Sequence, residues 1–152
     1  MKKADYMRHD IVRDEHIDWG LNEFEKYEKD IEKIKTKSKN DDDLFLFYGN
    51  SKKITEIVDA LVKLRDKAKG WQHRYEAQRD SLRADPFMHK MYIDWIYTWI
   101  SIVNGVESEI WALEEIQKKL EEIKSKKLKE ASDNLQDKSE SVITYPISNG
   151  RE

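Results

Sequence analysis

The pattern of apolar residues along the chain predicts one unusually long helix. Between residues 87 and 106 apolar side chains occur on nearly every side of a helical wheel, as in a helix buried between other elements. From residue 110 to 128 the pattern narrows to a single apolar stripe among charged residues. Since no helix-breaking residue separates the halves, we predict one helix over residues 86–131, buried first and solvated later.

Two shorter helices are predicted before it. The spacing of three and four from Ile17 to Ile34 predicts a helix over residues 5–37. A repeat of seven predicts a second helix over residues 51–84, with Ser51 as its N-cap. The repeat consists of Ile54, Leu61, Ala68, Tyr75 and Leu82, with a companion row of Ile57, Leu64, Trp71 and Gln78.

The turn at Asp85 and Pro86 predicts how these helices pack. An aspartate N-cap followed by proline at the first helical position ends one helix and begins the next. Such a short connection forces an antiparallel hairpin, with aromatic side chains in one layer around Trp71, Tyr75, Trp95 and Trp99. We therefore expect an all-α fold, an antiparallel three-helix bundle with coiled-coil-like packing that occupies residues 1–131.

The segment between the first two helices is a candidate contact region. Three successive carboxylates at residues 41–43 repel one another in a compact helix, which favours a loop over residues 38–50. The apolar run that follows either covers the open end of the bundle or docks on a partner protein. The candidate partner-binding residues here are Leu44, Phe45, Phe47 and Tyr48.

The end of the long helix is a second candidate. At about 1.5 Å per residue it is longer than its hairpin partner, so residues 118–131 have no cover within the hairpin. The first helix covers this overhang, or the overhang pairs with a second copy or another protein. The candidate contact residues are Leu120, Ile123 and Leu128.

Residues 132–152 have the polarity of a flexible tail with a β-prone segment at residues 142–147. Such a peptide is suited to strand addition on a partner's sheet, although termini are commonly loose. The candidate contact residues are Val142, Ile143, Tyr145 and Ile147.

Composition narrows the class of protein. A chain of 152 residues fits one domain, and 39% charged residues with 5 Gly and 2 Pro are typical of long, solvated helices. Zero cysteines exclude disulfides, thiolate metal sites and cysteine nucleophiles. The first ten residues lack the apolar core of a signal peptide, so we expect a cytoplasmic protein. Lys90 and Asp94 argue against a membrane span at residues 87–106.

Candidate chemistry is sparse. No glycine-rich phosphate loop, GxSxG elbow or HExxH motif occurs. His9 and His16 share a helix face with nearby carboxylates, but a metal site in a bundle needs ligands from several helices. We therefore expect no cofactor and no bound metal. The pairs Glu25/Glu28 and Glu56/Asp59 resemble the ExxE and ExxD pairs of all-α nucleotide pyrophosphohydrolases, a resemblance that implies Mg²⁺ between helices and leaves a hydrolase as an alternative.

A basic stripe on the second helix gives a nucleic-acid alternative. Residues 63–83 carry seven Lys or Arg against three acidic residues, in a chain whose net charge is −3. Pairing with acidic neighbours on other helices is the competing explanation, since phosphate binding needs unmatched basic surface. The candidate residues are Lys63, Lys67, Lys69, Arg74, Arg79 and Arg83.

The sequence thus favours a non-enzymatic helical protein that binds another protein, its own copy or a host component. Two forms are open: a subunit of an assembly such as a virion component, and a viral or mobile-element inhibitor that occupies a host machine. A nucleic-acid-associated protein and a Mg²⁺-dependent pyrophosphohydrolase are the alternatives.

Overall fold

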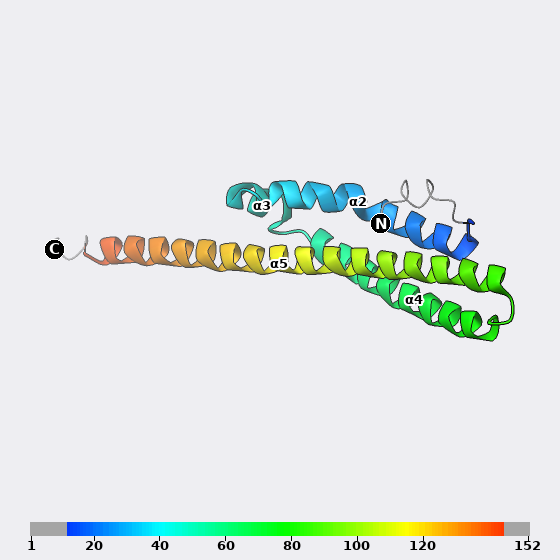
Figure 1. Ribbon diagram of the computed structural model, residues 1–152. Helices are drawn as coiled ribbons and strands as arrows, with labels where there is room; N and C mark the ends of the chain where they lie inside the picture. Colours follow the sequence, from blue (N-terminus) through cyan, green and yellow to red (C-terminus); the bar gives the residue numbers. More distant parts are fainter. Residues whose placement is uncertain (1–11, 145–152) are drawn as a thin grey trace, which may run out of the picture.

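The protein is all-α, as the sequence predicts. A computed structural model describes residues 12–144, with side chains to residue 135, and these residues form four helices and no strand. The helices are α2 (Glu15–Lys37), α3 (Asp41–Tyr48), α4 (Lys53–Ser81) and α5 (Pro86–Thr144). Figure 1 shows α5 as the axis of the molecule, with α2 and α4 beside its first half and α3 over its middle.

The turn between α4 and α5 forms as predicted. The helix α5 begins at Pro86, and the Asp85 carboxylate accepts a hydrogen bond of 3.2 Å from the Met88 amide. This satisfies one of the amides that a helix N-terminus otherwise leaves without a partner. The chain thereby reverses direction within residues 82–85, and α4 lies alongside α5 (Figure 1).

Two rows of residues spaced by seven form the core between α4 and α5. Each residue of these two rows is at most 8% exposed. Ile57 and Leu64, from the companion row of α4, are buried beside them. Repeats of seven keep one side of each helix turned toward its neighbour over several turns. The rows are Ile54, Leu61, Ala68 and Tyr75 on α4, and Trp99, Val106, Leu113 and Leu120 on α5.

The segment predicted as a loop contains the helix α3. The prediction was wrong because Asp41, Asp42 and Asp43 occupy the first turn, where the helix dipole favours negative charge. Asn40 caps the helix by accepting a hydrogen bond of 3.0 Å from the Asp43 amide. Leu44 and Tyr48, four residues apart, form its buried side.

Three predicted helix limits also differ from the structure. The first helix begins at Glu15 and not at residue 5, and residues 5–11 lie outside the described part of the chain. The second is shorter than residues 51–84, with the Ser51 hydroxyl accepting from the Lys53 amide at 3.0 Å. The third continues beyond residue 131 to Thr144, so residues 132–144 of the predicted tail are helical.

None of the helices formed by residues 12–144 contains a stretch long and apolar enough to cross a membrane. The Trp-rich segment of α5 instead contributes Trp95, Trp99 and Ile102 to the core.

Candidate functional site

The four candidate contact residues of α3 divide between core and surface. Leu44 is 0% exposed and Tyr48 is 7% exposed, so both stabilise the body of the protein. Burial, followed by the nearby Asp30 carboxylate, raises the pKa of Tyr48 above its ordinary value. Phe47 is 45% exposed, and its ring lies 4.0 Å from Lys37 Nζ. Phe47 is thus the most accessible of the four.

Helix α3 covers the first part of the predicted overhang of α5. Leu120 and Ile123 are only 6% and 9% exposed. Lys119 Nζ donates to the Ser38 carbonyl at 2.6 Å and lies 3.3 Å from the Asp41 carboxylate. The start of α4 thus reaches Leu120, and α3 adds further cover to this stretch of α5.

The cover ends at Lys127. Its ammonium group lies 3.7 Å from the Asp42 carboxylate and 5.0 Å from the centre of the Phe45 ring. One residue later Leu128 is 73% exposed, and Leu135 is 66% exposed. Of the three overhang candidates, only Leu128 therefore lies on the surface.

The four tail candidates are only partly within the described residues. Val142 and Ile143 belong to the helical backbone of α5, so a strand is not formed at these two positions. Tyr145 and Ile147 lie outside the described part of the chain.

The six basic candidates on α4 do not form one unmatched stripe. Lys69 lies 3.2 Å from Glu107 of α5, as the charge-matching explanation predicts, and Arg79 lies 3.2 Å from Asp80. Lys67 and Arg74 lie over the rings of Trp19 and Trp71. The remaining candidates are Lys63, which lines a hollow beside Glu56 and Asp59, and Arg83, which follows the end of α4.

The carboxylate pairs of the hydrolase alternative do not form a metal cage within the described chain. Glu56 and Asp59 line a hollow on α4 together with Glu23, whereas Glu25 and Glu28 do not contribute to it. Among residues 12–135, no three His, Asp or Glu side chains lie close enough together to hold a metal ion.

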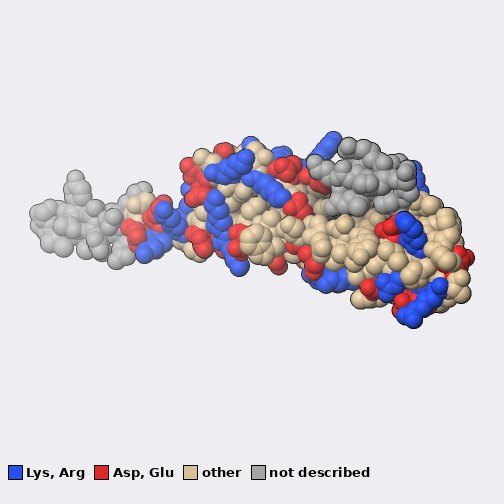
Figure 2. All heavy atoms as spheres, in the orientation of Figure 1, with Lys and Arg blue, Asp and Glu red and all other residues tan. Residues whose placement is uncertain are grey.

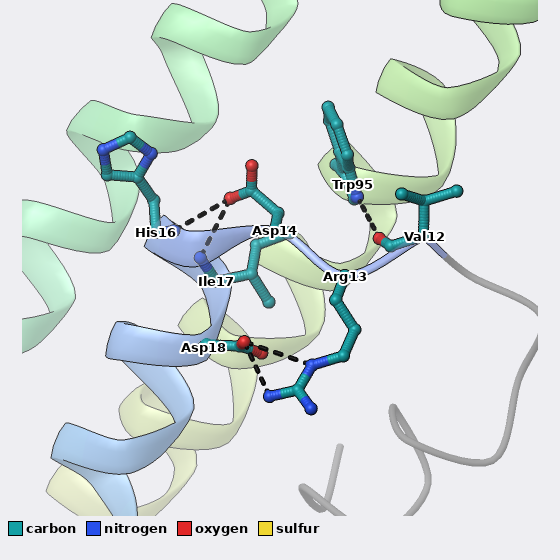
Figure 3. Close-up of polar contacts among 7 residues, drawn as sticks. All are labelled: Val12, Arg13, Asp14, His16, Ile17, Asp18 and Trp95. Carbon is teal, nitrogen blue, oxygen red and sulfur yellow. Dashed lines mark hydrogen bonds and ion pairs between the residues drawn. The ribbon is translucent and has the colours of Figure 1, made fainter.

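A polar network at the start of α2 was not predicted from the sequence. Figure 3 shows Asp14 folded back over the first turn, where its carboxylate accepts hydrogen bonds from the amides of His16 and Ile17 at 3.1 and 3.0 Å. The residues before it are held against α5, because Trp95 Nε1 donates to the Val12 carbonyl at 2.7 Å. The sequence did carry a signal for this helix start. Asp14 is an N-cap residue type and lies three residues before Ile17, the first apolar residue of the helical pattern.

The same carboxylate anchors the aromatic layer. The Tyr75 hydroxyl donates to Asp14 at 2.5 Å, and the Tyr75 ring lies 5.9 and 6.1 Å from the rings of Trp95 and Trp99. Burial, together with the hydrogen bond to Asp14, raises the pKa of Tyr75 far above its ordinary value. All four predicted rings belong to this layer, because Trp71 makes an edge contact with Tyr75 at 6.3 Å; Trp71 also stacks on His16 with centroids 3.9 Å apart.

Beside this layer lies a surface pocket between α2 and α4. Its volume is about 570 Å³. The walls are the indole rings of Trp19 and Trp71, and the charged groups at its rim are Glu15, Lys67 and Arg74. Lys67, Gly70, Trp71 and Arg74 recur at spacings of three and four, so they share one face of α4.

Exposed apolar side chains gather on α5. Figure 2 shows a broad uncharged surface along its first half, whereas Lys, Arg, Asp and Glu crowd the part near α3. The large apolar side chains of α5 that are at least 66% exposed are Phe87, Tyr97, Trp111, Leu128 and Leu135.

Comparisons of the chain with protein-family models, with curated proteins and with solved structures find no match.

Proposed function

We propose that the protein is a non-enzymatic protein-binding module whose contact element is the projecting end of α5, residues 128–144. In this proposal α2, α4 and α5 form an antiparallel three-helix body that carries the projection. The observation that supports it is the high exposure of Leu128 and Leu135, 73% and 66%, directly after the ion pair of Lys127 with Asp42 of α3. Apolar residues seven apart on an uncovered helix are typical of helix pairing.

The partner that fits best is a second copy of the chain in antiparallel orientation. Residues 124–129 contain four lysines and no acid, whereas residues 130–140 contain four acids and one lysine. Antiparallel pairing brings the basic half of one copy against the acidic half of the other, and parallel pairing brings like charges together. Opposite charges across a helix pair set partner choice and orientation.

The register follows from the two leucines. An antiparallel pair centred between Ala131 and Ser132 places Leu128 of one copy opposite Leu135 of the other. The same register places position 126, a lysine, opposite position 137, an aspartate. The small side chain of Ala131 at the centre permits close approach of the two helices. In this register the uncovered stretch that the two copies share is residues 128–135, which spans roughly 12 Å, so we expect a weak, concentration-dependent dimer.

Sedimentation of the full chain over a range of concentrations tests the proposal. The wild type should shift from monomer to dimer, and the double substitution Leu128→Glu with Leu135→Glu should hold it as a monomer. Leu46→Glu is the matched control, because Leu46 is also exposed (77%) but lies on α3. A wild type that stays monomeric at every concentration, or a double variant that dimerises as well as the control, would refute self-pairing.

Disulfide trapping of introduced cysteines tests the relative orientation of the two helices. The chain has no cysteine of its own, so no other thiol competes. A Leu128→Cys copy mixed with a Leu135→Cys copy should give mainly the mixed disulfide dimer. Parallel pairing would instead give dimers of each variant with itself. High salt should weaken the wild-type dimer, since the proposed charge pairs are exposed.

A further inference from the structure

We infer that the pocket between α2 and α4 binds a small ligand that combines a planar aromatic ring with an anionic group. This site lies on the body and is independent of pairing through the end of α5. Its volume of about 570 Å³ falls within the range of about 300 to 1,000 Å³ typical of small-molecule sites.

Two tryptophan rings that line the pocket favour an aromatic ligand. Trp19 from α2 and Trp71 from α4 both line the pocket, and both are only half-buried. His16 stacks on Trp71 with centroids 3.9 Å apart and an interplanar angle of 30°. His16 stacks on the Trp71 ring and Arg74 lies over it, so a ligand ring would meet Trp71 by an edge contact and the partly accessible ring of Trp19 by stacking.

One lining residue of the pocket is a glycine that the packing of the fold does not require. Gly70 lies in the interior of α4, where glycine is less favourable than alanine. A Cβ atom at this position would meet no atom within 4 Å, so neighbouring packing does not explain the missing side chain. Gly70 is also a lining residue of the pocket. Its effect is to let a flat ligand approach the helix backbone closely.

Two cationic side chains that line the pocket, Lys67 and Arg74, favour an anionic ligand. Lys67 and Arg74 lie on the same face of α4, three residues before Gly70 and four residues after it. Within residues 12–135 neither has a carboxylate within 4.0 Å. Lys67 Nζ lies 5.7 Å from the centre of the Trp19 ring, and the Arg74 guanidinium lies 4.7 Å from the centre of the Trp71 ring. Both are available to bind carboxylate or phosphate oxygens, which guanidinium groups bind bidentately.

Glu15 is the one acidic residue that lines the pocket. Its carboxylate opposes an anionic ligand, so two cations against one acid leave a net positive rim. Removal of this charge should therefore tighten binding, while removal of either cation should weaken it. A pocket that binds its ligand through apolar contacts alone would not show these opposite changes in affinity.

The chain offers an internal control for a binding experiment. Its five tryptophans give five indole N–H signals in a proton–nitrogen correlation spectrum. Indole-3-acetate and adenosine monophosphate serve as probes, one with a carboxylate and one with a phosphate, and their relative affinities identify which anion the site takes. We expect saturable shifts at Trp19 and Trp71 with at least one probe, and little change at Trp111, which lines a different groove.

Neutral indole, adenosine and inorganic phosphate separate the two halves of the ligand. Each should bind at least tenfold more weakly than the probe that contains both ring and anion. Equal binding of the neutral compound overturns the anionic requirement, and equal binding of phosphate overturns the aromatic one. Absence of saturable shifts with both probes overturns the site.

Substitutions then test the residues. Gly70→Leu should abolish the shifts by filling the pocket, while circular dichroism shows an intact helical protein. Lys67→Gln and Arg74→Gln should each weaken binding about tenfold, and Glu15→Gln should strengthen it. Arg83→Gln, just beyond the end of α4 and outside the pocket, is the control and should leave binding unchanged. Binding that survives Gly70→Leu contradicts the inference.

Discussion

The Tyr75 hydroxyl donates a 2.5 Å hydrogen bond to the carboxylate of Asp14, the residue that also caps the start of α2. These two residues are 61 positions apart, so one carboxylate joins the first turn of α2 to the aromatic layer on α4. The position of α2 against the hairpin depends on this contact as well as on apolar burial.

Removal of this hydroxyl should destabilise the protein. Tyr75→Phe leaves the ring in place but removes a hydrogen bond to a charged acceptor, which lowers the free energy of unfolding by about 1 to 3 kcal/mol. Urea denaturation monitored by circular dichroism measures the change. Tyr97→Phe is the matched control, because Tyr97 is 67% exposed and should change stability little. Equal effects of the two substitutions would contradict a stabilising role for the bond.

The raised pKa of Tyr75 predicts a loss of stability in alkali. Burial, followed by the bond to Asp14, raises the pKa in the folded state, whereas an unfolded tyrosine titrates near its usual pKa of about 10. Below this pH both states hold the proton and the stability is fully present. Above it only the unfolded state loses the proton, so Tyr75 contributes a decline approaching about 1.4 kcal/mol per pH unit.

Denaturation of the wild type and of Tyr75→Phe between about pH 9 and pH 11.5 isolates this contribution. The difference in unfolding free energy between the two proteins should shrink as the pH rises. A difference that stays constant over this range would show that Tyr75 titrates alike in both states.

Two helical glycines should respond oppositely to the same substitution. At Gly70 a Cβ atom meets nothing within 4 Å, so Gly70→Ala should raise stability by about 0.5 to 1 kcal/mol. At Gly20 a Cβ atom would lie 3.0 and 3.2 Å from ring atoms of Trp99, which is 0% exposed and cannot move aside readily. Gly20→Ala should therefore destabilise the protein. Thermal unfolding of both variants checks the two signs, and a gain at both positions would refute the close packing at Gly20.

Docking of α3 should depend on Leu44 much more than on its neighbours. Leu44 is 0% exposed, and truncation of a buried leucine to alanine costs about 2 to 5 kcal/mol. Leu46→Ala, at a position that is 77% exposed, should cost little. Hydrogen exchange of amides in residues 41–48 should accelerate only in the Leu44 variant. Similar exchange in both variants would show that α3 is held by its ion pairs instead.

Local sequence signals predicted the hairpin because they act over short distances. The repeat of seven through Leu61 and Ala68, together with Asp85 and Pro86, defines both the buried side of α4 and the start of α5. Local signals gave a wrong prediction for α3, which was expected to be a loop. The three aspartates repel one another in the middle of a helix, but the helix dipole favours them in the first turn. The helical continuation beyond residue 131 was not predicted. This stretch is polar and has few apolar residues, so it shows no periodic pattern by which a helix could be distinguished from a flexible tail.

The candidate sites depend on contacts that no spacing reveals. Tyr75 meets Asp14, and Trp71 meets His16, only after α2 is laid against α4. The grouping of Lys67, Gly70 and Arg74 on one helix face was visible in the sequence. Its counterpart Trp19 required the position of α2, so the pocket emerged only from the fold.

The continuity of α5 also fixes geometry at a distance. From residue 106 to Thr144 it contains neither glycine nor proline, and its 59 residues span about 90 Å. Each residue adds about 1.5 Å of length and about 100° of rotation. Insertion of seven helical residues after Lys127 should therefore move whatever binds the projection about 10 Å farther from the body with little change in direction. Insertion of only five residues should rotate it to nearly the opposite side, so α5 sets both the distance and the direction of its end.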